Sequence, residues 1–175
     1  MSQNAVSNSL KRFFSRNTIL WLIIMIYPFL FLWQGLNFSD EGNALTIYQL
    51  IFSNPQSISD TFGAWGANVF GGLWLLIFGG FGLIGARFAG ALISVLTVVI
   101  AYFILREHIE RKILLLGFLI SFLFSYHFLT LTIVGYNNLS VLFFVLAIFF
   151  LSSGLKKDDN ALIFLAGLIL SLNIF

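Results

Sequence analysis

The chain has 175 residues, of which 59% are hydrophobic and only 9% are charged, whereas about a quarter of the residues in a soluble domain are charged. This composition excludes an ordinary soluble domain and indicates an integral membrane protein. The net charge of +2 comes without a basic stripe, which argues against nucleic acid as a partner. Cysteine is absent, which excludes a disulfide framework, a thiolate metal site and a cysteine nucleophile.

The polar amino terminus carries Lys11, Arg12 and Arg16 ahead of an apolar run from Thr18 to Leu36. That run is long enough to cross the membrane as a helix and is longer than the apolar core of a typical signal peptide. No small-residue cleavage site follows it. We therefore predict an uncleaved first span, preceded by a cytoplasmic amino terminus over residues 1–17.

Four later segments are candidates for further spans, because roughly 20 apolar residues cross the hydrocarbon core as a helix. They run from Leu83 to Leu105, Ile113 to Ile133, Leu139 to Leu155 and Ala161 to Phe175. A helix satisfies its backbone polar groups internally, as a bilayer requires. The sequence therefore predicts an all-α, polytopic transmembrane domain over residues 18–175 with about five spans.

One more apolar stretch, from Ala64 to Gly82, has the length of a span but is rich in glycine. Loops rich in Lys and Arg stay in the cytoplasm, so the loop with Arg106, Arg111 and Lys112 belongs on the same side as the amino terminus. Only one crossing then separates residue 40 from that loop. Each interior glycine costs about 1 kcal/mol relative to alanine, and we predict that the glycine-rich stretch lies on the outer membrane surface.

The predicted outer loop, residues 37–82, begins with an amphipathic helix from Asn43 to Phe52. Polar residues recur in it at three-residue spacing opposite a broad apolar face. Asn54-Pro55 ends the helix, because proline removes a backbone donor and biases its predecessor away from helix. We expect this helix to lie on the membrane surface as well.

Asp40 and Glu41 form an acidic pair directly after the first span. Such a pair is typical of a helix start, where the positive end of the helix dipole favours acids. Two carboxylates at the membrane boundary are also suited to act as a general base or a metal ligand for a lipid-linked substrate. The residues alone leave both interpretations open.

Arg87 and Asn137 are the other candidate site residues. Arg87 lies near the outer end of the second span, where its guanidinium can bind a phosphate group or snorkel to the interface. Asn137 lies in a polar turn, Gly135 to Asn138, that the predicted topology places on the same face. No paired His or His–acid spacing predicts a metal site. No cofactor is assigned, and a divalent metal stays open.

Three stretches of the chain together resemble a known family. They are Phe38-Ser39-Asp40-Glu41-Gly42-Asn43-Ala44, then Phe81-Gly82-Leu83-Ile84-Gly85-Ala86-Arg87-Phe88-Ala89-Gly90-Ala91-Leu92, then Ala101-Tyr102-Phe103-Ile104-Leu105-Arg106. In this order they resemble the amino-terminal part of membrane-embedded GT-C glycosyltransferases, especially the dolichyl-phosphate-mannose protein mannosyltransferase and bacterial aminoarabinose transferase group.

The resemblance implies a glycosyltransferase of the bacterial inner (plasma) membrane that moves a hexosyl or pentosyl group on the outer face. The donor would be a polyprenyl-phosphate sugar, and the acceptor a lipid, a glycan or a protein. Asp40 would be the catalytic base or the residue that positions the acceptor, with Glu41 beside it. The substrate-binding roles of Arg87 and Asn137 are predicted from the residues and the topology rather than from the resemblance, with Arg87 as a partner for the donor phosphate.

Three departures from the family pattern limit what the resemblance implies. Residues 62–66 contain no proline, although many members have one or two before the second surface helix. Asn137-Asn138 stands where relatives often carry a second outer Asp, which weakens a metal role. Family members are several-fold longer, so we expect the chain to be the amino-terminal portion of a longer enzyme and to be inactive alone.

Two other classes of protein stay open as alternatives. A small transporter subunit would carry ionisable residues near the centres of its spans, and this sequence has no Asp, Glu, Lys or Arg there. A non-catalytic membrane scaffold could use the glycine-rich stretch to pack helices closely. A scaffold would need no carboxylate at position 40.

Overall fold

The computed structural model describes residues 16–35, 40–58, 65–128 and 133–172. Its elements in chain order are α2 (Arg16–Ile26), η1 (Tyr27–Trp33), α3 (Asp40–Leu50), η2 (Pro55–Ile58), α4 (Trp65–Phe78), η4 (Gly79–Phe81), α5 (Gly82–Leu105), α6 (Arg111–Phe128), α7 (Tyr136–Lys157) and α8 (Asn160–Ser171). No strand occurs in these ranges, and the prediction of an all-α fold is confirmed. Phe38 and Ser39 of the acidic motif and residues 62–64 lie outside the described residues.

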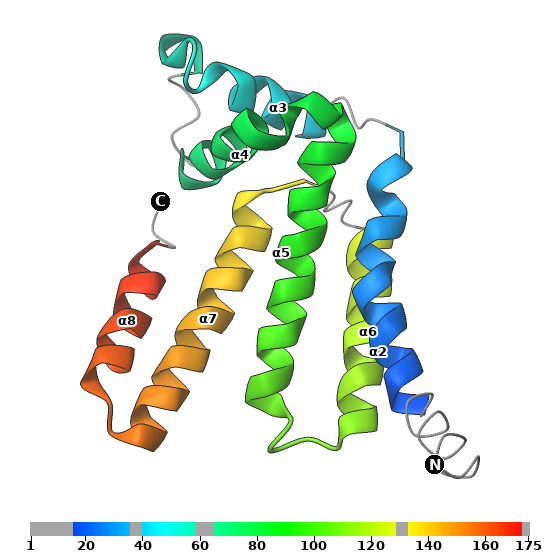
Figure 1. The fold of residues 1–175 in the computed structure, drawn as a ribbon, viewed down its shortest axis with the longest axis vertical. Coiled ribbons are helices and arrows are strands. Elements are labelled where there is room, and N and C mark those ends of the chain that lie inside the picture. Colours follow the sequence, from blue (N-terminus) through cyan, green and yellow to red (C-terminus); the bar gives the residue numbers. More distant parts are fainter. Residues whose placement is uncertain (1–15, 36–39, 59–64, 129–132, 173–175) are drawn as a thin grey trace, which may run out of the picture.

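The helices form a bundle with a cap at one end. Figure 1 shows α2, α5, α6, α7 and α8 running side by side, while α3 and α4 lie across the end of the bundle opposite the start of α2. The connections from α5 to α6 and from α7 to α8 lie at the other end. The cap is therefore built from the segment that the sequence assigned to the outer loop.

α5 is the central helix of the bundle. Ile93 of α5 packs with Leu139 and Leu142 of α7 in one buried cluster. Further along α5, Val98 packs with a second cluster that contains Ile24 of α2 and residues of α6. One cluster therefore packs α5 against α7, and the other packs α5 against α2 and α6.

The first helical segment changes its character at a proline. α2 is α-helical up to Ile26, and η1 continues it as a 3-10 helix with Pro28 in its first turn. Proline has no backbone N–H and disturbs the preceding turn of an α-helix, which accounts for the change. The 3-10 helix ends at Trp33.

α4 buries its small residues and exposes its large ones. Ala67, Gly71 and Gly72 are among the residues that it buries, whereas Leu76 and Ile77 are 70% and 73% exposed. The chain then turns into α5 at Gly82, whose φ of 57° lies in the left-handed region that favours glycine. Leu76 and Ile77 of α4 therefore lie on the outer surface of the protein rather than in its core.

Two helical stretches of the described residues are long and apolar enough to cross a membrane, Trp65–Leu105 and Tyr136–Lys157. The shorter helices Asn17–Phe31 and Asn160–Ser171 are also apolar. The first long stretch comprises α4, η4 and α5, and Figure 1 shows that α4 lies across the bundle end while α5 runs along the bundle. The number of spans, about five, stays a prediction.

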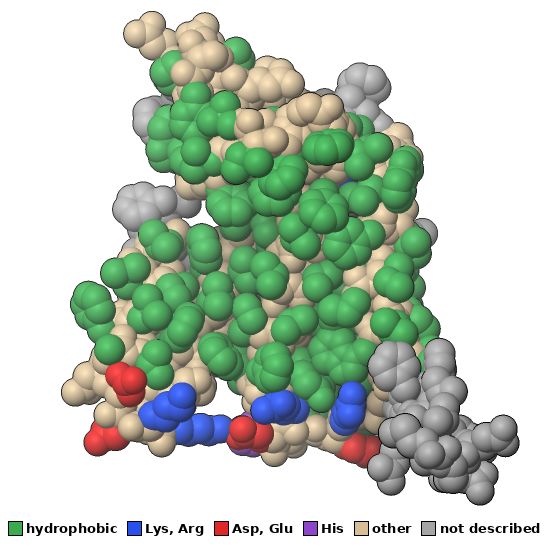
Figure 2. All heavy atoms as spheres, viewed as in Figure 1, with side chains coloured by type: hydrophobic (Ala, Val, Ile, Leu, Met, Phe, Trp, Pro, Cys, Tyr) green, Lys and Arg blue, Asp and Glu red, His purple; other side chains and the backbone are tan. Residues whose placement is uncertain are grey.

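Large hydrophobic side chains cover the flanks of the bundle (Figure 2). Each of the bundle helices α2, α5, α6, α7 and α8 exposes such side chains, for example Leu22, Phe103, Phe124, Phe144 and Phe164. A soluble monomer rarely exposes a contiguous apolar surface of this size. The apolar flanks and the long apolar helices identify an integral membrane protein.

Most of the charged side chains in the described ranges gather at the end of the bundle opposite the cap (Figure 2). Lys156 of α7 donates a hydrogen bond to the Glu107 carboxylate in the α5–α6 loop, and both side chains are exposed. Asp159 caps α8 by accepting from the backbone N–H groups of Ala161 and Leu162. Asp159 therefore has the geometry of a helix N-cap.

Candidate functional site

The acidic pair lies in the first turn of α3, where the two carboxylates have opposite surroundings. Asp40 is the first residue of α3 and is exposed. Glu41 is only 3% exposed. Neighbouring residues on a helix do not face the same way, so one side chain can point to the protein interior and the other to solvent. The helix-start interpretation of this pair is confirmed, because both acids lie in the first turn.

Glu41 binds Arg87 through a two-pronged ion pair. The Nε atom of Arg87 donates to Oε1 of Glu41 at 3.1 Å, and Nη2 donates to Oε2 at 2.7 Å. Arg87 is 1% exposed, in the second turn of α5. This bidentate geometry is the strongest form of an Arg–carboxylate contact. It joins the start of α3 to α5.

The remaining donors of Arg87 bind the end of the first helical segment. Nη1 donates to the backbone carbonyls of Leu32, at 3.1 Å, and of Gln34. Nη2 also donates to the carbonyl of Gly35 at 2.9 Å. The last carbonyls of a helix have no donor within the helix. Arg87 supplies donors to these three carbonyls.

All five N–H donors of the guanidinium therefore have acceptors within the protein. We call Arg87, Glu41 and the carbonyls of Leu32, Gln34 and Gly35 the arginine latch. The latch holds together three segments that are distant in the sequence: the end of η1, the start of α3 and the start of α5. Arg87 does not snorkel to the surface, and contact with a phosphate group would require it to release a protein acceptor.

A second connection joins α3 to the loop before α7. The Tyr48 hydroxyl donates to the backbone carbonyl of Val134. Burial raises the pKa of the Tyr48 phenol, so the hydroxyl stays protonated and remains a donor. A Cβ atom at Gly71 would lie 2.5 Å from the Tyr48 ring. Glycine at position 71 therefore gives the ring room to pass α4.

The same loop places Asn137 at the start of α7. Asn137 is exposed in the first turn of that helix, whereas Asn138 is buried. The side chain of Asn138 accepts from the backbone N–H of Gly135 and donates to the carbonyl of Ile133, both at 2.7 Å. Asn138 thus fixes the loop, and the side chain of its neighbour Asn137 is left at the surface.

Of the four predicted site residues, the structure brings Glu41 and Arg87 into direct contact. Asp40 immediately precedes Glu41 in the first turn of α3. Asn137 lies in the first turn of α7, just after the loop that Tyr48 contacts at Val134. The sequence reasoning missed Tyr48 and treated Asn138 only as part of a turn. The signal available in the sequence was the combination of a tyrosine in the predicted outer helix and the Gly71-Gly72 pair, which leaves room for an aromatic ring.

The sequence assigned no metal ligands and left a divalent metal open. Within the described ranges, no group of three or more His, Cys, Asp or Glu side chains has the arrangement of a metal site. Of the acidic pair at the cap, Glu41 already binds Arg87.

Comparison with known proteins gives one match. A family model described as Dolichyl-phosphate-mannose-protein mannosyltransferase matches residues 64–174, which is well over half of the chain. The matched region includes Arg87 and Asn137, while Asp40 and Glu41 precede it. Neither a curated protein nor a solved structure matches the chain.

Proposed function

The chain belongs to the dolichyl-phosphate-mannose-protein mannosyltransferase family, and from this premise we propose that it takes part in transfer of a sugar from a polyprenyl-phosphate donor to an acceptor on the outer membrane face. Glycosyltransferase activity is general to the family. The observation that carries the proposal is the exposed Asp40 carboxylate at the start of α3, next to a residue held by the arginine latch.

Asp40 is proposed as the base of the reaction. Its carboxylate would accept the proton of an acceptor hydroxyl while the hydroxyl oxygen bonds to the anomeric carbon of the donor sugar. The bond from that carbon to the phosphate oxygen breaks, and the polyprenyl phosphate leaves with its electron pair. A base must be accessible to the substrate, and the exposure of Asp40 supports this role.

Glu41 and Arg87 are proposed as positioning residues. Glu41 has both oxygens bound by Arg87, so uptake of a proton by Glu41 would disrupt this ion pair. The latch instead holds the first turn of α3 against α5, and Asp40 with it. A site held this way is preorganised, because the supporting residues have fixed partners. Asn137 is proposed as a substrate contact, since its amide is exposed at the start of α7.

The proposed topology has about five spans, a cytoplasmic amino terminus and an outer cap of α3 and α4. It is supported by the position of the basic residues Arg106, Arg111, Lys112, Lys156 and Lys157, which all lie in or beside the loops at the end of the bundle opposite the cap. Basic loops favour the cytoplasmic side. The large exposed apolar residues of α4 suit a helix that is partly inserted at the outer interface.

Substitution of Asp40 tests the proposed chemistry. In the full-length protein, Asp40→Asn is expected to lower transfer from a polyprenyl-phosphate sugar by roughly 100-fold or more, the range for loss of a general base. The free energy of unfolding should fall by no more than about 1 kcal/mol, the scale of an exposed charge at the positive end of a helix dipole. The matched control is Glu110→Gln, an exposed acid at the opposite end. Unchanged transfer by Asp40→Asn would show that Asp40 has no catalytic role.

Accessibility in intact cells tests the topology separately. The chain has no native cysteine, so single cysteines at Ser39, Ser57 and Glu110 can be labelled without background. The proposal expects labelling at Ser39 and Ser57 from outside, and at Glu110 only after permeabilisation. Labelling of Glu110 from outside would mean that α4 also crosses the membrane, and the outer cap would be wrong.

A further inference from the structure

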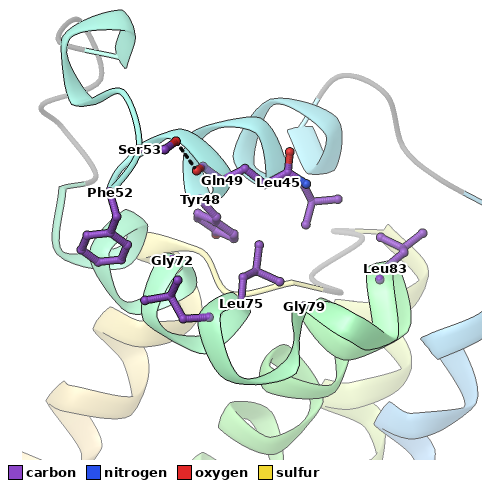
Figure 3. Close-up of a pocket in the computed structure, with 11 residues that line it drawn as sticks. Leu45, Tyr48, Gln49, Phe52, Ser53, Gly72, Leu75, Gly79 and Leu83 are labelled. Carbon is purple, nitrogen blue, oxygen red and sulfur yellow. Dashed lines mark hydrogen bonds between the residues drawn. The ribbon is translucent and has the colours of Figure 1, made fainter.

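A groove lies between α3 and the corner where α4 passes into α5 (Figure 3). Its volume is about 520 Å³, within the range of roughly 300–1,000 Å³ that is typical of small-molecule sites. Figure 3 shows Leu45, Tyr48 and Phe52 on its α3 side and Leu75 on its α4 side. The groove is separate from the arginine latch, because none of the latch residues lines it.

The lining is apolar and uncharged. Among the described residues around the groove, only Tyr48, Gln49 and Ser53 have polar side chains. The hydroxyl of Ser53 already donates to the backbone carbonyl of Gln49, and the hydroxyl of Tyr48 donates to Val134. A charged ligand group would find no partner of opposite charge here, so the chemistry fits an uncharged apolar chain.

The groove is continuous with the apolar surface of the protein. Leu76 lines it and is 70% exposed. Phe81, at the same corner, is 71% exposed. α4 contains no charged residue, and Leu73, Leu76 and Ile77 are exposed on it. Because this is an integral membrane protein, the apolar surface next to the groove is the surface that meets lipid.

Glycines create part of the space. Gly72, Gly79 and Gly82 line the groove without side chains. A Cβ atom at Gly79 or at Gly82 would meet nothing within 4 Å. These positions therefore border open space, unlike Gly72, where a Cβ atom would lie 2.5 Å from Ile51. The groove is a hollow that a flexible chain can enter from the lipid side.

We infer that this groove binds an acyl chain of a membrane phospholipid, which enters past Leu76 and lies between α3 and the α4–α5 corner. An acyl chain matches the uncharged lining, is present at high concentration at the adjoining surface, and buries apolar area that water would otherwise contact. The bound chain packs against both helices of the cap. This inference does not depend on the proposed transfer reaction.

Photo-crosslinking in vesicles tests the inference. The full-length protein is reconstituted into phosphatidylethanolamine and phosphatidylglycerol vesicles that contain a phospholipid with a diazirine at the end of one acyl chain. After illumination, labelled residues are located by mass spectrometry. Labelling of Leu45, Phe52 and Leu76 is expected to exceed that of Thr46, which is exposed on α3 outside the groove. Phe144, on the flank of α7, reports labelling by bulk lipid.

A matched pair of variants separates the groove from the general surface. Gly79 lines the groove, so Gly79→Leu places a side chain in its open space. Gly80 does not line the groove, and a Cβ atom there would meet nothing within 4 Å, so Gly80→Leu adds the same side chain outside the groove. Gly79→Leu should remove the groove labelling, while Gly80→Leu and the Phe144 signal should stay unchanged. If Gly79→Leu fails to fold, Gln49→Phe blocks the groove from an exposed lining position.

Three results would overturn the inference. The groove residues are labelled no more than Thr46, or the Leu variants at positions 79 and 80 lower labelling equally. Alternatively, a diazirine-bearing polyprenyl phosphate labels the groove and the phospholipid does not, which would assign it to another lipid. Loss of transfer activity in Asp40→Asn bears on none of these results, so the two proposals fail separately.

Discussion

Removal of Arg87 is the sharpest test of the arginine latch. In the structure Arg87 and Glu41 are 1% and 3% exposed. Arg87→Met removes the cation while keeping a long apolar side chain, and it leaves the buried Glu41 carboxylate without its two donors. Loss of one partner of a buried ion pair costs about 3–5 kcal/mol, because an uncompensated charge stays buried. We expect Arg87→Met to lower the free energy of unfolding by that amount.

The carbonyls of the latch should contribute less than the carboxylate. Gln34 and Gly35 are exposed, so water can reach their carbonyls once Arg87 is gone. Leu32 is buried, and its carbonyl would lose a donor at a cost of about 1–3 kcal/mol. The double variant Glu41→Leu/Arg87→Met removes both charges. It should therefore be less destabilised than the sum of the two single variants.

Arg87→Lys provides the intermediate case. Lysine keeps the positive charge but has three donors on one nitrogen, which cannot reproduce the planar fork on Glu41 and the carbonyl contacts together. We expect it to lie between the wild-type chain and Arg87→Met in stability. Such an order would separate the effect of charge from the effect of geometry.

Equilibrium unfolding of the full-length protein in bicelles, followed by helical circular dichroism, measures all four variants. The control is Arg106→Met, since Arg106 is exposed at the opposite end and lies over the ring of Phe103. A cost below about 1 kcal/mol for Arg87→Met, which is the range for surface ion pairs, would refute the reasoning. Additive effects in the double variant would also refute it, because the two residues would then act independently.

Further predictions concern the packing of α3 and the charged end of the bundle. Gly71→Ala should cost about 1–3 kcal/mol in unfolding experiments, because its Cβ atom would lie 2.5 Å from the Tyr48 ring. Tyr48→Phe should cost about 1–3 kcal/mol and raise amide exchange at the start of α7, because the buried Val134 carbonyl loses its donor. The hydrogen bond from Lys156 and its positive charge lower the pKa of Glu107. The stabilisation from this pair is therefore present above the unfolded-state pKa and is lost as pH falls through the folded-state pKa; Lys156→Gln should raise the Glu107 pKa in a carboxyl NMR titration.

Each of these predictions has a control. Gly117→Ala lies in α6 with nothing within 4 Å of the new Cβ atom, so it should not destabilise. Tyr136→Phe changes an exposed tyrosine at the start of α7. The close contact at Gly71 would be wrong if Gly71→Ala matched Gly117→Ala, and the Tyr48 connection would be wrong if its loss cost no more than Tyr136→Phe. A Glu107 pKa that is the same with and without Lys156 would contradict the third prediction.

Much of the helix order could be predicted from the chain alone. The segments from Leu83 to Leu105 and from Leu139 to Leu155 correspond to α5 and α7. Long apolar runs that end in charged loops need only local information to be recognised. The outer helix was predicted from Asn43 but begins at Asp40. Its start was harder to place, because the two acids fit both a loop motif and a first turn.

The roles of the acids could not be separated by local patterns. Asp40 and Glu41 are adjacent and chemically alike, and both were predicted from the sequence as catalytic residues. In the structure Glu41 is buried against Arg87, 46 residues later, and Asp40 is exposed. Which face of the first turn meets the protein depends on how α3 packs on α4 and on where this places Glu41 relative to Arg87, and no spacing within the motif encodes that packing.

The sequence by itself determined that this is an all-α membrane protein of a glycosyltransferase family, with its basic loops separated from its acidic motif. Composition, apolar run length and charge position are local properties, and they suffice for those conclusions. Only the tertiary structure decided that Arg87 lies inside a latch and that Tyr48 reaches Val134, 86 residues away. Contacts over such separations depend on how the helices pack together, so they emerge only when the whole bundle is assembled.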